Sequence, residues 1–196
     1  MKLAADDVTR SLRASWQLMA RGAEALEDLE LTRGGFWRSF VALLPLTLPA
    51  AIALLAALRL HAGLPNSAGL FTAPGLALAV FGATLASILA VPALLFALAP
   101  HLAQTPSYTA FVIAWNWAGI IAAGLIAVPA AVFAIGWSTP GLALIQTLAF
   151  AAIALRLRYC AARAAFGAGS GLAAPVVLAS IVADYAILRF FGFIIF

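Results

Sequence analysis

Residues 109–134 read TAFVIAWNWAGIIAAGLIAVPAAVFA, an unbroken run without a charged side chain. An α-helix over this run is about 39 Å long at 1.5 Å per residue, which exceeds the ~30 Å hydrocarbon core of a bilayer. Inside hydrocarbon a chain must satisfy its backbone polar groups by itself, and a helix does so within one segment. The run therefore predicts a transmembrane helix, with Asn116 as its most polar residue.

The lack of charge extends far beyond this run, because no Asp, Glu, Lys or Arg occurs between Arg59 and Arg156. The whole chain is 65% hydrophobic and only 9% charged, against roughly 25% charged in an ordinary soluble domain. So few polar side chains cannot cover the surface of a soluble fold of this size. Acidic residues cluster between Asp6 and Glu30, and Asp184 is the exception. The composition predicts an integral membrane protein.

The hydrophobic stretches are long enough for five spans, which are expected at residues 38–58, 75–99, 109–134, 140–157 and 172–194. Turn-forming segments at 61–69, 100–107 and 136–140 separate them. The expected fold class is an all-α, polytopic membrane helical bundle of five transmembrane helices, preceded by an amphipathic interfacial helix.

The N-terminal segment has a different pattern, with Val8, Leu12, Trp16, Met19, Ala23 and Leu26 at helical spacing and charged residues between them. It predicts an amphipathic helix that lies along the cytosolic interface or packs against the cytosolic end of the bundle. The expected organisation is a cytosolic amphipathic helix and linker over residues 1–35, followed by a five-span bundle over 36–196.

The distribution of Lys and Arg predicts the orientation, since cytoplasmic ends of spans carry an excess of both. With the N-terminus inside, the cytosolic side holds Lys2, Arg10, Arg13, Arg21, Arg33, Arg38, Arg156, Arg158 and Arg163. The far side then holds only Arg59. We expect a multi-pass protein of the bacterial inner membrane, with a cytoplasmic N-terminus and a periplasmic C-terminus. The sequence has no basic cluster with interleaved aromatic residues, so we do not expect a nucleic-acid partner.

Helix association in lipid needs small residues or polar contacts. Gly75, Ala79, Ala83 and Ser87 recur every four residues, and so do Gly119, Ala123 and Ala127. Each row is typical of a flat face on which a neighbouring helix lies, although alanine-rich composition also generates such rows by chance. Prolines within or near the starts of spans are expected to kink helices, and neighbouring helices can satisfy the carbonyls they free. They are Pro45, Pro49, Pro92, Pro129 and Pro175.

Asp184 is the most informative candidate, because a carboxylate within the membrane needs a partner or a proton. One hypothesis is an intramembrane polar site that binds a proton or a cationic substrate, formed by Asp184 with Asn116, Gln146, Ser180 and Arg189. The other is a structural role, in which Asp184 is protonated or paired with an Arg side chain. A direct pair with Arg189 is disfavoured, since five residues place the two side chains about 140° apart on a helix.

Four basic residues near span ends, Arg38, Arg156, Arg158 and Arg163, are candidates for binding lipid headgroups or for fixing orientation. No Ser-His-Asp set, paired carboxylates or metal-ligand spacing occurs, so the chain is not expected to be an enzyme or to hold a metal or cofactor. The single cysteine, Cys160, excludes an intrachain disulfide.

Three stretches carry a resemblance: Gly35-Phe-Trp-Arg-Ser-Phe40, Phe111-Val-Ile-Ala-Trp-Asn-Trp117 and Arg158-Tyr-Cys-Ala-Ala-Arg163. Together they resemble an uncharacterised family of small alphaproteobacterial inner-membrane proteins. The five-span layout is also similar to the Yip superfamily, although the Asp-Leu-Tyr-Gly-Pro segment of its eukaryotic members is missing here. The resemblance implies location rather than activity. It marks Trp37 and Trp117, with Arg38, Asn116 and Arg163, as family-like positions.

Two functions follow from these observations. The first is a non-enzymatic organiser or accessory subunit, whose small-residue faces and amphipathic helix engage the lipid bilayer, a protein partner or a second copy of the chain. The second is a transporter of a small solute or ion that uses the polar residues around Asp184. A continuous aqueous path to Asp184 would distinguish the second from the first.

Overall fold

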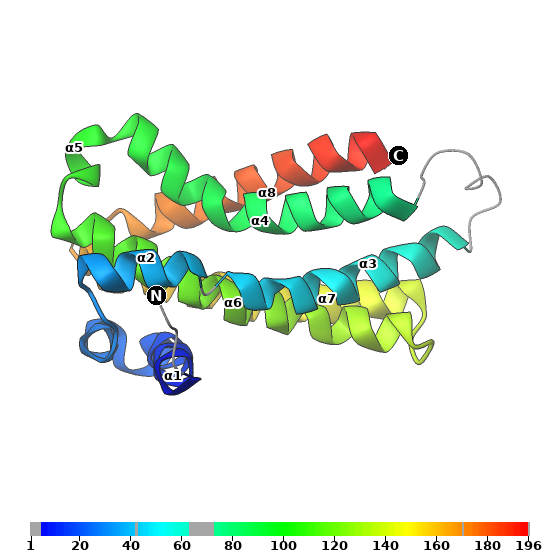
Figure 1. The fold of residues 1–196 in the computed structure, drawn as a ribbon, viewed down its shortest axis with the longest axis horizontal. Coiled ribbons are helices and arrows are strands. Elements are labelled where there is room, and N and C mark those ends of the chain that lie inside the picture. Colours follow the sequence, from blue (N-terminus) through cyan, green and yellow to red (C-terminus); the bar gives the residue numbers. More distant parts are fainter. Residues whose placement is uncertain (1–4, 42, 63–72, 170, 196) are drawn as a thin grey trace.

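The computed structural model describes residues 5–41, 43–62, 73–169 and 171–195, and over these residues it is helical without a strand. The elements in chain order are α1 (Ala5–Arg21), the 3-10 helix η1 (Gly22–Asp28), α2 (Arg33–Val41), the 3-10 turn η2 (Leu44–Leu46), α3 (Thr47–Ala62), α4 (Ala73–Leu98), α5 (Pro100–Ala103), α6 (Pro106–Ala134), α7 (Pro140–Phe166) and α8 (Ala173–Ile195) (Figure 1). Most of the predicted connection at 61–69 lies outside the described residues.

Five helical segments are long and apolar enough to cross a membrane: Arg33–Leu60, Gly75–Leu98, Pro106–Ala134, Pro140–Phe166 and Ala173–Phe191. They confirm the five predicted spans, and the chain is a multi-pass membrane protein of the all-α class. The first span is divided into α2, η2 and α3. The division falls at Pro45, which lies in η2 and has no N–H to donate to a continuous helix.

The fourth helix extends past its membrane span. The sequence interpretation placed the span at residues 140–157 and expected the arginines that follow to extend the helix into the cytosol, and α7 continues to Phe166. Arginine and alanine are both good helix formers, so the positive charges do not end the helix. At 1.5 Å per residue α7 is about 40 Å long, so it extends beyond a ~30 Å hydrocarbon core and carries its last turns out of it.

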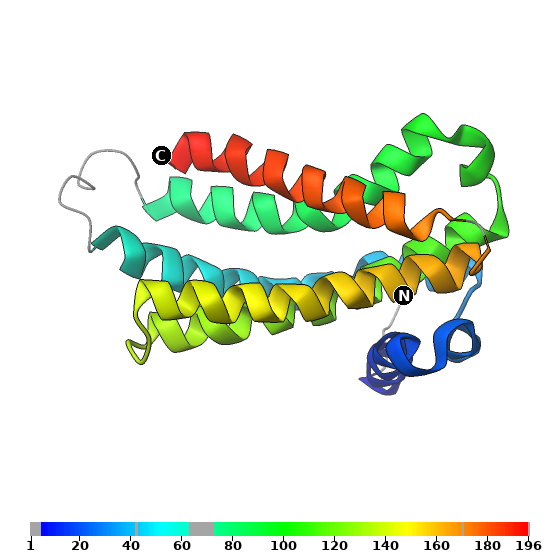
Figure 2. The ribbon, with the colours of Figure 1, turned by 180° about the vertical axis from the view of Figure 1, so that it is seen from behind.

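The spans form two layers. α3, α6 and α7 pack side by side in one layer, with α6 and α7 in the most extensive contact, and α4 pairs with α8 in the other (Figures 1 and 2). α8 begins beside α7 and diverges from it toward its C-terminal end. Small residues permit the close approaches: a side chain at Gly119 would meet Ile88 of α4, and one at Gly82 would meet the ring of Phe191 in α8.

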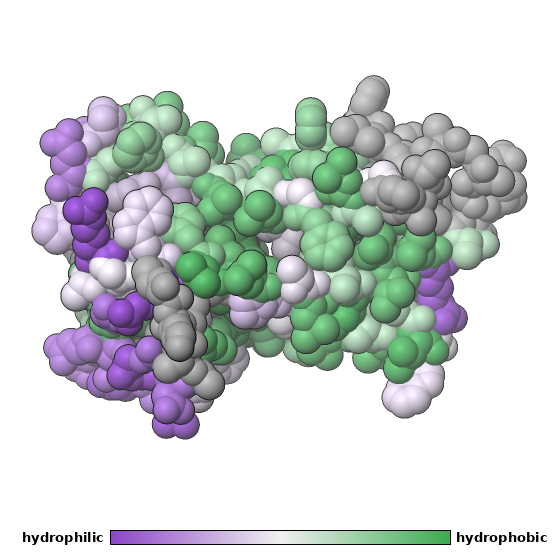
Figure 3. Space-filling view, viewed as in Figure 1, coloured by the Kyte–Doolittle hydropathy of each residue, from purple (hydrophilic) through white to green (hydrophobic). Residues whose placement is uncertain are grey.

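Polar and apolar surfaces are segregated along the bundle. Hydrophilic residues gather at the end that carries α1, and hydrophobic residues cover the middle (Figure 3). Large apolar side chains such as Leu78, Leu98 and Val182 are more than half exposed. An apolar band of this kind between polar ends matches a bilayer rather than water as the surrounding solvent.

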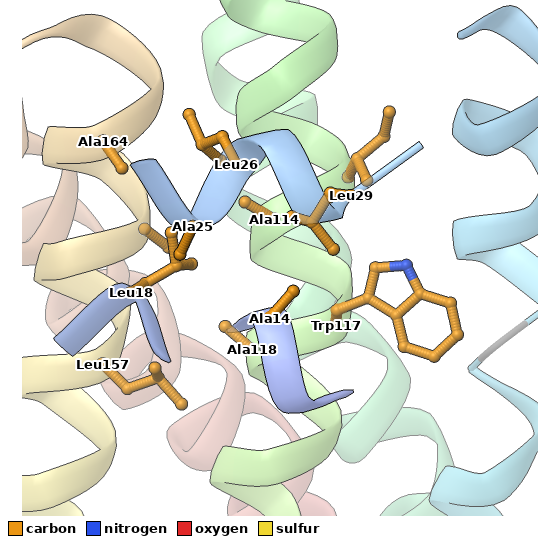
Figure 4. Close-up of a cluster of buried hydrophobic side chains, with 12 residues drawn as sticks. Ala14, Leu18, Ala25, Leu26, Leu29, Ala114, Trp117, Ala118, Leu157 and Ala164 are labelled. Atoms are coloured by element: carbon orange, nitrogen blue, oxygen red, sulfur yellow. The ribbon is translucent and has the colours of Figure 1, made fainter. Parts of the chain in front are cut away.

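The amphipathic segment packs on the spans as a crosswise pair of helices. Figure 1 views α1 almost along its axis, so α1 runs across the direction of the spans. Ala14 and Leu18 of α1, with Leu26 of η1, are buried against Trp117 of α6 and Leu157 of α7 (Figure 4). This confirms packing against the bundle, and Trp16, at 46% exposed, points away from it.

Candidate functional site

Asp184 lies where three helices meet. Arg158 Nη1 of α7 donates to its Oδ2 at 2.6 Å, and Ser87 Oγ of α4 donates to its Oδ1. The Arg158 side chain is 10% exposed and the Asp184 side chain 35%. The pair has no net charge, which lowers the free-energy cost of burying either group in hydrocarbon. Of the two hypotheses for Asp184, the geometry matches the one in which an arginine is its partner.

Trp115 connects this ion pair to a proline in α4. The guanidinium of Arg158 lies over the Trp115 ring, with Cζ at 5.3 Å from the ring centroid. The indole Nε1 of Trp115 donates to the Ile88 carbonyl at 3.1 Å. Pro92 lies four residues after Ile88 and has no N–H, so it leaves that carbonyl without its helical partner. An aromatic side chain of α6 thus satisfies the carbonyl that Pro92 frees.

A second aromatic side chain of α6 contacts the same proline. Tyr108 Oη donates to the Pro92 carbonyl at 2.9 Å, and this bond is buried. α4 bends in its second half in Figures 1 and 2. Tyr108 and Trp115 lie two turns apart on α6 and contact α4 at the proline and one turn before it. The sequence expectation that a neighbouring helix satisfies a freed carbonyl is met at Pro92.

Asn116 belongs to a separate polar contact between α6 and α2. Its Nδ2 donates to Ser39 Oγ at 3.0 Å, and Ser39 Oγ donates to the Phe36 carbonyl at 2.7 Å. Asn116 and Ser39 are both fully buried. The Oδ1 of Asn116 has no hydrogen-bond partner among the described residues. Asn116 therefore joins the first span to the third rather than contributing to the surroundings of Asp184.

The joint between η1 and α2 is also closely packed. Arg38 Nη1 pairs with Glu30 Oε2 at 2.6 Å, and Gly35 N donates to Thr32 Oγ1 at 3.1 Å. A side chain at Gly35 would place its Cβ 1.8 Å from the Glu30 carbonyl oxygen, so only glycine fits there. Arg38 thus holds a carboxylate of its own chain as well as lying near a span end.

A cavity of about 360 Å³ lies between the two layers. Its walls are made largely of small and apolar residues of α3, α6 and α7. Those at its polar end are Arg158, Asp184, Ser87 and Thr84. The ion pair therefore occupies one end of an otherwise apolar space, where Asp184 retains its partial exposure.

The predicted polar site is not assembled as proposed. Ser180 is buried and donates to the Val177 carbonyl of its own helix at 2.8 Å. Within the described part of the chain, Gln146 Oε1 is buried without a partner, and Gln146 does not line the cavity. Arg189 is exposed on α8. Rise along a helix places Gln146 at a depth similar to that of Asp184, but it does not predict the face on which a side chain lies.

The basic residues of α7 divide into two kinds. Arg156 and Arg163 are exposed, as residues that meet headgroups would be. Arg158 differs from its prediction, because it turns inward to Asp184 rather than outward to lipid phosphates. The reason is helical geometry: Arg158 shares the inner face of α7 with Ala154 and Ala161, which are buried.

The stretches that carry the family resemblance converge in the fold. Ser39 of the first contacts Asn116 of the second, and Arg158 of the third contacts Trp115 of the second. Trp117 is 3% exposed and packs beneath α1, whereas Trp37 is 55% exposed.

Sequence reasoning gave no polar role to Ser87 and no individual role to Trp115 or Glu30. A signal existed for Trp115, since a proline four residues after a carbonyl requires a donor from outside the helix. Nothing in the sequence alone identified which residue would supply it.

No family model matches the chain, and no curated protein or solved structure matches it either. The resemblance therefore stays a prediction. The fold and the site define a class: a multi-pass helical membrane protein with an internally neutralised charge pair beside an apolar cavity.

Proposed function

We propose that this chain is a non-enzymatic protein of the bacterial inner membrane that acts as an organiser or accessory subunit. The observation that supports it is the engagement of Asp184 by Arg158 and Ser87. A transport site for a cation needs a carboxylate that is free to change partners, and this carboxylate already joins α8 to α7 and α4. The walls beyond it offer a polar substrate few hydrogen-bond partners.

The distribution of charge supports an orientation with the N-terminus in the cytoplasm. The connections after α4 and after α7 lie at the same end of the bundle as α1. The exposed Arg13, Arg156 and Arg163 belong to elements at that end. At the other end, Arg59 donates to the Ala134 carbonyl at 3.1 Å and lies over Phe133, so its charge is used to cap α6. The positive-inside bias then favours the α1 end as cytoplasmic.

The second candidate function is transport of a small solute or ion. The observation that favours it is the cavity itself, because it reaches the partly exposed Asp184 from between the two layers. The two functions differ in whether water fills this space.

Accessibility of single cysteines to a charged reagent separates the two functions. The native thiol is first removed by Cys160→Ala, and cysteine is then placed at Ala151 or Ile181, which line the cavity. The matched control is cysteine at Ala168, which is exposed in the connection after α7. Each variant in intact membranes is treated with a charged maleimide and with an apolar one.

An organiser predicts that only the apolar reagent labels Ala151→Cys and Ile181→Cys, while both reagents label Ala168→Cys. Labelling of the two cavity positions by the charged reagent at a rate close to that of the control would favour the transporter. Protein level in the membrane is measured in parallel, so that loss of labelling is not confused with loss of protein.

A further inference from the structure

The cavity between the layers has the shape and polarity of a site for a single-chain amphiphile. Its apolar length runs along α6 from Gly119 to Ala130, about 16 Å at 1.5 Å per residue. Ala53 of α3 and Ala151 of α7 complete the small-residue walls. In the spanning part of the bundle the surrounding medium is hydrocarbon, so an apolar chain rather than water is available to fill such a space.

The polar end supplies both a donor and an acceptor. Arg158 is nine-tenths buried and lines the cavity. Asp184 keeps about a third of its side chain exposed although it is ion-paired. Since both residues line the cavity, the guanidinium and the partly exposed carboxylate can together bind a head that accepts one hydrogen bond and donates another.

A neutral carboxylic acid is the head that fits this pair. Its carbonyl oxygen accepts from the Arg158 guanidinium, and its O–H donates to the Asp184 carboxylate. It adds no charge to the neutral pair, whereas a phosphate or a free ammonium would add one in a medium of low dielectric constant. Ser87 is already engaged with Asp184 and stays so.

The volume restricts the tail to one chain. A cavity of about 360 Å³ holds about a dozen groups the size of a water molecule or a methylene. The two chains and the glycerol of a phospholipid exceed that space. Arg158 lies eight residues before the end of α7, so a head bound there sits about 12 Å from the end of the helix, with its tail toward the middle of the bilayer.

We propose that this cavity is a binding site for a single-chain carboxylic acid of about a dozen carbons, whose head contacts Arg158 and Asp184 and whose chain lies along α6. The proposal goes beyond a role as an organiser or accessory subunit, and it requires neither water in the cavity nor transport.

The test uses the full chain in nanodiscs of phosphatidylcholine, with dodecanoic acid carrying a photoactivatable diazirine near its methyl end. Peptides that become labelled on illumination are identified by mass spectrometry. Labelling is expected on α6 between Gly119 and Ala130 and on the adjacent part of α7. An excess of unlabelled dodecanoic acid is expected to reduce it at least tenfold, and equal amounts of dodecane or phosphatidylglycerol less than twofold.

Two matched pairs of variants test the location. Ala151→Phe fills the cavity from α7, whereas Ala152→Phe places the same ring on the exposed face of that helix. Ala127→Phe and Val128→Phe form a second pair on α6, where Ala127 lines the cavity and Val128 is 49% exposed. Each cavity variant should lose at least tenfold in labelling, and each neighbour less than twofold.

Several results would overturn the proposal. Undiminished labelling of both cavity variants would show that the probe binds elsewhere. Equal competition by dodecane would show that the head is not recognised, and competition by phosphatidylglycerol alone would point to a phospholipid instead. If Ala151→Phe fails to accumulate, Ala127→Phe still tests whether filling the cavity prevents labelling. The cysteine-labelling outcome for the proposed function is independent of all these results.

Discussion

At the scale of single residues, Arg158 and Asp184 form the contact with the largest consequence if one partner is lost. Removal of Arg158 leaves a carboxylate in a medium of low dielectric constant with Ser87 as its one remaining donor among the described residues. Breaking a buried ion pair in this way costs about 3–5 kcal/mol. We expect a value at the lower end for this pair, because the Asp184 side chain is 35% exposed.

The prediction is that Arg158→Met strongly lowers the accumulation of the protein and its thermal stability in detergent, while the double variant Arg158→Met with Asp184→Leu recovers most of both. Two apolar side chains of similar size leave no uncompensated charge. Size-exclusion chromatography after heating measures the effect. Equal losses in the single and double variants would contradict a structural role for the pair.

Asn116 permits a second residue-scale prediction, because its Oδ1 is buried without a partner among the described residues while its Nδ2 is bonded to Ser39. Asn116→Leu removes the unsatisfied acceptor along with the donor, so stability should stay within about 1 kcal/mol of the wild type. Asn116→Asp introduces a buried carboxylate without a cation and should cost several kcal/mol.

The informative result is whether Asn116→Leu is more stable than Asn116→Asp. Stability is measured as the midpoint temperature of thermal aggregation in the same detergent. A Leu variant less stable than the Asp variant would mean that the amide contributes more than its contact with Ser39.

At the scale of helices, the bend in α4 depends on a side chain of α6. Trp115→Phe removes the indole donor and leaves the Ile88 carbonyl unsatisfied, which costs about 1–3 kcal/mol. In a Pro92→Ala background the new N–H can bond to that carbonyl within the helix, so the same tryptophan substitution should cost less than half as much.

The double-mutant cycle on Trp115 and Pro92 measures this coupling directly, and about 1 kcal/mol is expected. Additive effects of the two substitutions would show that the indole and the proline act independently. The Phe side chain keeps an aromatic ring near Arg158, so the cycle isolates the hydrogen bond from most of the ring contact.

At the joint between the amphipathic segment and the first span, two adjacent glycines differ in the space available for a side chain. Ala at position 35 would bring its Cβ to 1.8 Å from the backbone oxygen of Glu30, and that oxygen cannot move without displacing η1 or α2. Ala at position 34 would meet the Glu30 carboxylate tip at 3.3 Å, which a rotation of the side chain relieves.

We therefore expect Gly35→Ala to destabilise the protein by about 1–3 kcal/mol or more, and Gly34→Ala to be tolerated. Hydrogen exchange over residues 5–41 is the measurement, since displacement of η1 should speed exchange there. Equal exchange in the two variants would exclude a steric requirement for glycine at position 35.

At the scale of the whole molecule, the topology predicts which connections face each compartment. A phosphatase reporter that is active only in the periplasm should be inactive when fused after Gln104 or Ala168, and active when fused after Ser138. A fluorescent reporter that folds only in the cytosol should give the complementary pattern. Activity of the phosphatase at Gln104 would reverse the proposed orientation and leave the helical fold unaffected.

The sequence predicted the number of spans because length and hydropathy are nearly sufficient for a helix in hydrocarbon. It predicted that an arginine could neutralise Asp184, but not that Arg158 would do so, since rise along a helix gives depth and not direction. Gln146 was grouped with Asp184 because of its similar depth, and Asn116 because it is another strongly polar residue within a span, but neither side chain lines the cavity beside Asp184. A kink in the first span at Pro45 was expected, and so was the extension of the fourth helix through the arginines after residue 157.

The packing of α1 on α6 and α7 has a consequence for synthesis. Leu18 contacts a surface that includes Leu157, which the ribosome adds 139 residues later (157 minus 18). At translation rates of 5–20 residues per second, that interval is about 7–28 s. Until it ends, the nascent N-terminal helix lacks the part of its final surroundings that α7 supplies, and that side of Leu18 is exposed to the membrane surface or to a chaperone. The packing of α1 on the bundle is therefore completed only after the fourth span has been synthesised.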